Sequence, residues 1–278
     1  MVRLHPVHLL LLFFLFSSLS EAKEFRLGIM YDNPVVAKKY YTLANYIKAN
    51  GLDTTIHKFT RYNHAIKAFS DHKLDAMISG SGVAGILILK DIAYPILRPL
   101  NVQGWSTYRA VIISHKGSKK YNKRSAFFNN KSVAATELAS SGEFFIKSIN
   151  NSSLTMLPVG SHLLALRSLA RGVSDIAIIK NRVWDSVFLH YPQLEKVGEV
   201  LGSNPNNPLM ISRQTDLQAV NKIRAILQKL EFDDSKLALQ VKQQLQIEKY
   251  IVTTLDDFKY TIKLLQRAGV TKEYKFSR

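Results

Sequence analysis

The 278-residue chain contains no cysteine. No disulfide bond can therefore stabilise it, and its stability must come from packed cores. The same absence excludes a lipid attached to an N-terminal cysteine. Beyond the first 22 residues, no segment is long and apolar enough to cross a bilayer, which takes about 20 residues. We therefore expect a water-soluble mature protein without a lipid anchor.

The usual sequence patterns of catalytic sites are also missing. The chain has no His-x-x-x-His, no Gly-x-Ser-x-Gly and no Walker-type loop, and its eight histidines are dispersed. A catalytic triad is assembled in space rather than in sequence, so an enzyme stays open as the less favoured alternative. We expect a protein that binds rather than converts its ligand, with no metal and no cofactor.

Acidic residues are few: the chain contains 21, against 38 lysines and arginines, which gives a net charge of +17. Such an excess suits nucleic acid, anionic ligands or an anionic envelope surface. Export, which the N-terminus predicts, argues against nucleic acid. One local basic cluster is interpreted as a solvated loop rather than a docking patch. It consists of Lys116, Lys119, Lys120, Lys123 and Arg124.

The N-terminus has the form of a secretory signal. Arg3 precedes an apolar run from Leu9 to Phe16, and small residues follow at Ser20 and Ala22. The apolar run is short for a membrane span, so we predict a cleaved signal peptide at residues 1–22. An uncleaved membrane anchor is the alternative.

Strands and helices are predicted to alternate after the signal. The predicted strands are Phe25–Tyr31, Thr54–Phe59 and Leu74–Ile78, and the predicted helices are Val35–Asn50, Asn63–Ser70 and Val83–Leu89. In an open parallel sheet, ligands bind beyond the carboxyl ends of the strands. Tyr31, Ser79 and Ser81 therefore fall where a site is expected. A plain Gly/Ser turn is the alternative for the two serines.

The stretch KSVAATELASSGEFFIKSI, from Lys131 to Ile149, predicts a buried strand, a polar turn and a helix. Thr136, Ser140 and Ser141 lie in the turn or at the helix start. Free backbone N–H groups and the helix dipole favour a bound anion there, and a glycine allows close approach to the main chain. The alternative is an ordinary serine N-cap without a ligand.

A second stretch, LPVGSHLLALRSLARGVSDIAII from Leu157 to Ile179, places a Gly-Ser-His turn before a helix and a Gly-x-x-Asp-x-Ala strand. Gly160, Ser161 and His162 form the turn. This order resembles the PhnD-like, phosphonate-binding family of periplasmic solute-binding proteins. The resemblance extends more loosely from Phe25 to Thr215.

The resemblance implies an α/β type II periplasmic binding fold with two α/β lobes joined by two crossing strands. Lobe 1 would comprise residues 23–114 and 209–278, and lobe 2 residues 115–208. The ligand would bind between the lobes, with hydroxyl or backbone contacts from the turn at Ser79 and Ser81. The ring of Tyr108 would line the cleft, or form part of a core instead. His162 would donate to the ligand, or merely begin a helix.

Lys180 departs from the family pattern, because PhnD-like proteins commonly place an acidic residue at the end of this strand to meet a ligand amine. A lysine facing the cleft would disfavour an aminophosphonate and favour a more anionic ligand. A lysine pointing to solvent would carry no information about the ligand. The sequence leaves both orientations open.

The return crossing is predicted near Leu194 to Ser212, and the final third of the chain is predicted to be helical. Two helix starts resemble capping boxes, Thr215 with Gln218 and Thr254 with Asp257. These helices are expected to pack on lobe 1.

These observations together predict a monomeric, periplasmic solute-binding protein that captures a small phosphonate-like or phosphate-like oxyanion. The resemblance makes an ABC permease its partner, or alternatively a membrane sensor that reads the loaded protein. A secreted enzyme on the same fold, and a basic protein that binds nucleic acid or the envelope, are the further alternatives. Turnover would distinguish the enzyme, and salt-steep binding the basic protein.

Overall fold

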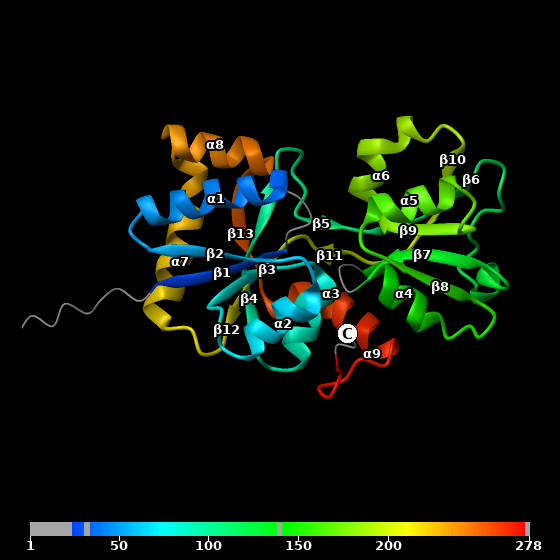
Figure 1. Cartoon of the computed structure of the whole chain (residues 1–278), viewed down its shortest axis with the longest axis horizontal. Helices are drawn as coiled ribbons and strands as arrows, with labels where there is room; N and C mark the ends of the chain where they lie inside the picture. Colours follow the sequence, from blue (N-terminus) through cyan, green and yellow to red (C-terminus); the bar gives the residue numbers. More distant parts are fainter. Residues whose placement is uncertain (1–23, 31–33, 138–140, 276–278) are drawn as a thin grey trace, which may run out of the picture.

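The protein consists of two α/β units, each built around its own sheet, as Figure 1 shows. The computed structural model describes residues 24–30, 34–137 and 141–275. The units are joined by a ribbon of two crossing strands, β5 (Thr107–Tyr108) and β11 (Asn204–Pro205), which pair antiparallel. The predicted signal at 1–22, Tyr31 and Ser140 lie outside the described residues.

The first unit contains a six-stranded sheet in the order β13-β4-β12-β3-β1-β2. Its strands are β1 (Phe25–Met30), β2 (Thr54–Phe59), β3 (Ala76–Ile78), β4 (Ala93–Asn101), β12 (Leu209–Ser212) and β13 (Ile247–Val252). Three helices cover each face (Figure 1). On one face they are α1 (Pro34–Ala49), α7 (Leu217–Lys229) and α8 (Lys236–Leu245), and on the other α2 (Tyr62–Ser70), α3 (Ser81–Leu89) and α9 (Lys259–Arg267).

The second unit contains a five-stranded sheet in the order β10-β6-β9-β7-β8. Its strands are β6 (Ala110–His115), β7 (Ser132–Thr136), β8 (Thr155–Val159), β9 (Ile176–Lys180) and β10 (Leu194–Glu199). Helix α4 (Ser141–Ile149) lies on one face, and α5 (His162–Ala170) and α6 (Asn181–Val187) lie on the other (Figure 1). Short 3₁₀ turns occur at Ser125–Phe128, Phe188–His190, Leu230–Phe232 and Leu255–Phe258.

The two sheets share one strand order. β2-β1-β3-β12-β4 in the first corresponds to β8-β7-β9-β6-β10 in the second. In each sheet the fourth of these strands enters directly from a crossing strand and runs antiparallel to its neighbours. The three strands before it are parallel, so their carboxyl ends meet at one edge.

An aspartate stands at the equivalent position in both sheets, just before the third of these strands. Asp75, just before β3, accepts hydrogen bonds from the backbone N–H of Arg26 at 2.9 Å and from its guanidinium at 2.9 and 3.0 Å. Asp175, just before β9, accepts from the backbone N–H and hydroxyl of Ser132, both at 2.8 Å. These bonds hold the pKa of Asp175 below its usual range. The aspartate of the Gly-x-x-Asp-x-Ala strand therefore fixes a strand pair.

Four clusters of buried side chains fill the two faces of the two sheets. Phe144 is the exception to this division, because it belongs to α4 of the second unit but lies in a core cluster of the first. That cluster also contains Phe258 and Leu265 from the C-terminal part of the chain. Apolar burial therefore holds the two units together in addition to the crossing strands.

Two expectations for the C-terminal third were wrong. Residues Ile247–Val252 form β13, which pairs with β4, so this part of the chain is not wholly helical. The N-cap of α7 is Asp216, which accepts from two backbone N–H groups of the first turn, whereas the hydroxyl of Thr215 donates to the backbone of Asp75. The capping box of Thr254 and Asp257 is confirmed.

The limit between the two units differs from the predicted one. β6 was assigned to lobe 1 by a boundary after Ser114, but it pairs with β9 and β10 of the second sheet. The first crossing strand ends at Tyr108, before β6 begins. We therefore propose that lobe 2 begins near residue 109 rather than at 115.

Candidate ligand-binding site

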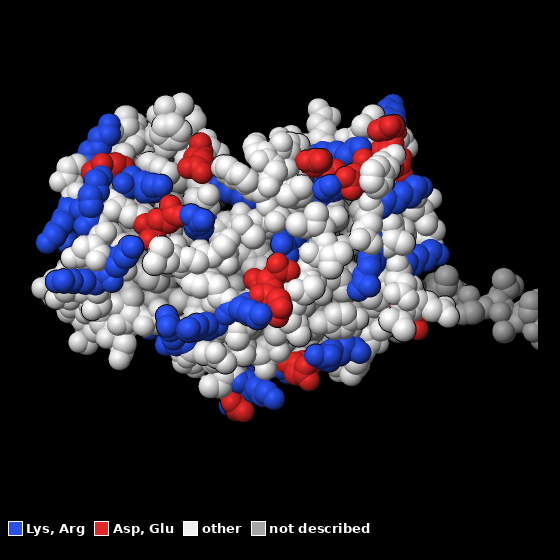
Figure 2. Space-filling model, turned by 180° about the vertical axis from the view of Figure 1, so that it is seen from behind, with Lys and Arg blue, Asp and Glu red and all other residues white. Residues whose placement is uncertain are grey.

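The candidate site lies where the carboxyl ends of parallel strands face the crossing strands. Ser79 follows β3, Thr136 ends β7 and Lys180 ends β9. Ser161 and His162 follow β8 at the start of α5. Figure 2 shows that the surface is hollowed between the two units at its upper edge. The parallel strand order thus brings residues from distant parts of the chain to one region.

Tyr108 links the two units through its hydroxyl. This oxygen forms a hydrogen bond with the hydroxyl of Ser81, at the start of α3, and accepts the backbone N–H of Ser141, at the start of α4, at 3.3 Å. Only 2% of Tyr108 is exposed, and burial raises the pKa of its phenol. Tyr108 and Ser81 are therefore engaged with each other, and the edge of the ring is held at the junction.

Thr136 and His162 form a second polar pair, with 2.9 Å between Oγ1 and Nδ1. Burial, together with the smaller effect of the charge of Lys180, lowers the pKa of His162 to about 3. The imidazole is therefore neutral at physiological pH and keeps a single N–H to donate. Ser161 caps α5 by accepting the backbone N–H of Leu164 at 3.2 Å, which leaves its O–H able to donate elsewhere.

Two serine hydroxyls in this region are buried without a hydrogen-bond partner among the described residues. They belong to Ser79, which is 3% exposed, and Ser141, which is 2% exposed. Buried polar groups are nearly always paired with protein or water, so such oxygens point to a partner that the chain does not supply. Ser141 also starts a nine-residue helix, whose free N–H groups favour an anion.

Lys180 points to the junction rather than to solvent. Its Nζ lies 4.4 Å from the centroid of the Tyr108 ring and 3.3 Å from the side-chain oxygen of Asn206, to which it donates. Burial, together with the smaller effect of the neighbouring charge of Arg182, lowers the pKa of Lys180 to about 8. The orientation that the sequence left open is thus inward.

Arg182, in the first turn of α6, was not predicted from the sequence. Its Nε and one terminal nitrogen are buried without hydrogen-bond partners in the described part of the chain, and its guanidinium carbon lies 5.8 Å from the Trp105 ring. Burial lowers its pKa as well. In the sequence, only its position two residues after Lys180 indicates that Arg182 lies near the site. The turn from β9 into α6 brings its guanidinium group there.

The site is therefore electropositive. Neither Lys180 nor Arg182 forms an ion pair with a carboxylate of the described residues. Bringing a cation out of water without a counter-ion costs free energy, and such groups persist mainly where they have a function. Within residues 24–30, 34–137 and 141–275, no group of three acidic or histidine side chains could hold a metal ion.

The predicted basic loop is exposed. Lys116, Lys119, Lys123 and Arg124 all face solvent, and Lys120 forms an ion pair with Glu195. In Figure 2, lysines and arginines are spread over both units rather than gathered in one patch. No helix in the described part of the chain is long and apolar enough to span a membrane.

Comparisons with known proteins agree with this architecture. The family described as "ABC transporter, phosphonate, periplasmic substrate-binding protein" matches residues 29–258. No curated protein matches the chain. Among solved structures, XAC2383 from Xanthomonas citri bound to ATP has a TM-score of 0.73 at 14% identity, covering 88% of this chain and 97% of that one.

Two further solved structures are similar over most of their length. PhnD1 from Prochlorococcus marinus in complex with methylphosphonate has a TM-score of 0.73 at 13% identity, covering 89% of this chain and 99% of that one. A binding protein component of a phosphonate ABC transporter from Pseudomonas aeruginosa has a TM-score of 0.71 at 15% identity, with 92% and 91% covered. These likenesses confirm the type II periplasmic binding fold. The chain belongs to the family of periplasmic substrate-binding proteins of phosphonate ABC transporters.

Proposed function

We propose that this protein captures a small phosphonate-like or phosphate-like oxyanion between its two units and presents it to an ABC permease. The observation that carries this proposal is a pair of cations without a carboxylate partner among the described residues, Lys180 and the half-buried Arg182. They lie in the same region as the buried hydroxyls of Ser79 and Ser141, which have no hydrogen-bond partner within the described residues. An oxyanion supplies negative charge for the two cations and acceptor oxygens for the hydroxyls.

The binding mode follows from the direction of the donors. The N–H groups at the starts of α4 and α5, with the hydroxyls of Ser141 and Ser161, would hold the oxygens of the anion. The hydrogen-bonded pair of Thr136 and neutral His162 would add one donor, either the hydroxyl of Thr136 or the Nε2–H of His162. Lys180 would approach from the Tyr108 side. Tyr31 and Ser140 stay predicted contacts, because they lie outside the described residues.

The charge of the site further supports a ligand without an amine. Lys180 stands where related proteins carry an acid, and it points inward. Methylphosphonate, bound by the similar PhnD1, and ATP, bound by the similar XAC2383, both carry phosphorus oxyanions. We propose that 2-aminoethylphosphonate binds more weakly than methylphosphonate, since its ammonium group would approach two cations.

Location and partner complete the proposal. Membership of this family implies the periplasm, and a cleaved signal at residues 1–22 would deliver the protein there. Lobe closure around the anion would present a surface that differs from that of the open form, so a membrane partner could distinguish the loaded protein. Crosslinking in cells would show whether that partner is a permease or a sensor.

Thermal unfolding of the mature protein tests the capture step. We expect methylphosphonate and phosphate to raise the midpoint, because a ligand that binds only the folded state stabilises it by about 2.7 kcal/mol at a hundred times Kd. 2-Aminoethylphosphonate, methanesulfonate and acetate are the comparison ligands. A midpoint that no anion raises would contradict the proposal.

The affinity should also depend on pH through Lys180. Its pKa is about 8, so it is charged below that value and neutral above it. A bound anion raises this pKa, so the affinity should fall as pH rises above 8, by about tenfold in total, the scale of one charge-assisted hydrogen bond. His162, with a pKa of about 3, stays neutral throughout.

Calorimetry on the wild type and on Lys180→Met separates this effect from ionisation of the ligand itself. The ligand titrates equally in both titrations, so the ratio of the two affinities reports Lys180 alone. We expect the wild-type advantage to shrink as pH rises through 8 and beyond. A ratio that stays constant would show that Lys180 does not contact the anion.

A further inference from the structure

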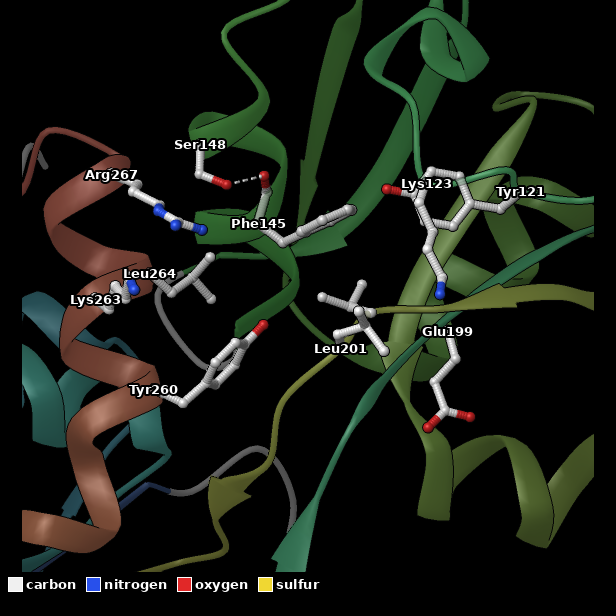
Figure 3. Close-up of a pocket in the computed structure, with 11 residues that line it drawn as sticks. Tyr121, Lys123, Phe145, Ser148, Glu199, Leu201, Tyr260, Lys263, Leu264 and Arg267 are labelled. Carbon is white, nitrogen blue, oxygen red and sulfur yellow. Dashed lines mark hydrogen bonds between the residues drawn. The ribbon is translucent and has the colours of Figure 1, made fainter.

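A second cavity lies between the two units, away from the candidate site. Its volume is about 360 Å³, within the range of small-molecule pockets, and none of its lining residues belongs to the candidate site. Figure 3 shows α9 on one side of it and α4 on the other. The segment after β10, which leads to the crossing strand β11, closes a third side. A ligand here would contact both units at once.

Part of the lining is apolar and aromatic. Phe145 of α4 projects into the cavity and packs edge-on against Tyr121, with 6.3 Å between ring centroids. Leu264 of α9 faces it, and Leu201, after β10, is 68% exposed. An exposed leucine beside two aromatic rings provides apolar surface that a ligand could cover.

Tyr260 forms a further wall, and a glycine leaves room for its ring. A Cβ atom at Gly202 would lie 2.1 Å from the Tyr260 ring, and Gly202 has a φ of +103°, which favours glycine. The ring therefore lies directly against the backbone after β10. It points toward the centre of the cavity in Figure 3, and its hydroxyl faces Phe145 and Leu201.

The remaining lining is cationic and uncompensated. Lys123, Lys263 and Arg267 form no ion pair with any carboxylate in the described part of the chain. Lys263 and Arg267 are four residues apart on α9, a spacing at which like charges repel. The one acid of the lining, Glu199, is already paired with Arg109 and Lys196. In Figure 3, Arg267 points toward α4 and Lys123 reaches in from the opposite side.

We infer that this cavity binds a small amphiphilic anion, with its apolar body between Phe145, Leu264 and Tyr260 and its anionic head at Lys263 and Arg267. The combination of an apolar wall and a cationic end distinguishes this cavity from the candidate site, whose hydroxyls and helix starts suit a compact oxyanion. The inference goes beyond the proposed function and does not depend on it.

Titration calorimetry with octanoate tests the inference, with octan-1-ol as the uncharged probe of the same chain length. We expect octanoate to bind and octan-1-ol to bind at least about tenfold more weakly, on the scale of a hydrogen bond to a charged group. Lys263→Gln with Arg267→Gln should reduce octanoate affinity by about the same factor. Equal affinity for the two probes, or an unchanged affinity in the double variant, would overturn the inference.

Two further variants test whether octanoate binds in this cavity. Lys222→Gln with Lys236→Gln removes the same charge from exposed positions on α7 and α8 and should leave octanoate binding unchanged. Leu201→Trp keeps every cation but fills the cavity, and should weaken binding. Octanoate binding that is lost in Lys180→Met but kept in the α9 double variant would place the ligand in the candidate site and reject the second one.

Discussion

Substituting Lys180 with glutamate is expected to weaken methylphosphonate binding by about 30-fold or more, the usual scale for disrupting a desolvated charge contact. The side chain points inward, 4.4 Å from the Tyr108 ring centroid, and its charge is uncompensated by the described carboxylates. A carboxylate there would repel the anion directly. It would also pair with Arg182 and withdraw a second cation from the ligand.

The same substitution should change which phosphonate is preferred. The ammonium group of 2-aminoethylphosphonate would gain a partner in the new carboxylate, so its affinity relative to methylphosphonate should rise. Calorimetry with both ligands measures this ratio. Lys222→Glu, an exposed charge reversal on α7, is the matched control and should leave the ratio unchanged. An unchanged ratio in Lys180→Glu would refute the role assigned to Lys180.

The stability of the ligand-free Lys180→Met variant shows whether weaker binding comes from a lost contact or from a damaged fold. The pKa of Lys180 is lowered chiefly by burial, which means that the folded protein disfavours the charged form. Lys180→Met removes that cost and keeps the length of the side chain, so its unfolding midpoint without ligand should equal or exceed that of the wild type. Weak binding in a variant that is this stable can only reflect the lost cation.

Substituting Phe144 with alanine should destabilise the protein by about 3–5 kcal/mol, the usual cost of truncating a buried phenylalanine. The side chain is fully buried and joins α4 to the core cluster that contains Phe258 and Leu265. Its loss would leave a cavity between the two units. Because Ser141 starts the same helix, oxyanion affinity should fall in the folded variant as well.

Equilibrium unfolding in urea measures this cost, and Phe232→Ala is the matched control. Phe232 is 80% exposed, so its truncation should change the free energy of unfolding by less than about 0.5 kcal/mol. A similar small effect for Phe144→Ala would show that α4 is not anchored to the first unit. A large loss of stability with unchanged anion affinity would separate the anchor from the site.

Much of the local structure follows from the sequence. The strand and the helix predicted within Lys131 to Ile149 are observed as β7 and α4, and the Gly-Ser-His turn does start α5 with Ser161 as its N-cap. Short-range hydrogen bonds and a repeating apolar pattern determine such units, and both are visible in a few consecutive residues.

Elements that depend on distant partners were harder to predict. β13 follows a helix and, among the described strands, pairs with β4 alone, well over a hundred residues earlier, so its strand character depends on that partner. The lobe limit that we propose, before β6, differs from the predicted one for the same reason, since β6 joins its sheet by pairing with β9 and β10. The spacing of apolar residues in a sequence indicates a strand, but it does not identify the strand with which it pairs.

By itself, the sequence determined the class of this protein: no disulfides, a basic chain, alternating strands and helices, and two turns that resemble those of the phosphonate-binding family. These are local or compositional properties. Only the tertiary structure decided that Lys180 points inward, that Arg182 joins it, and that Tyr108 links the two units. The physical reason is that burial and the position of a charge are set by residues from separate strands and helices, which meet only when the chain has folded.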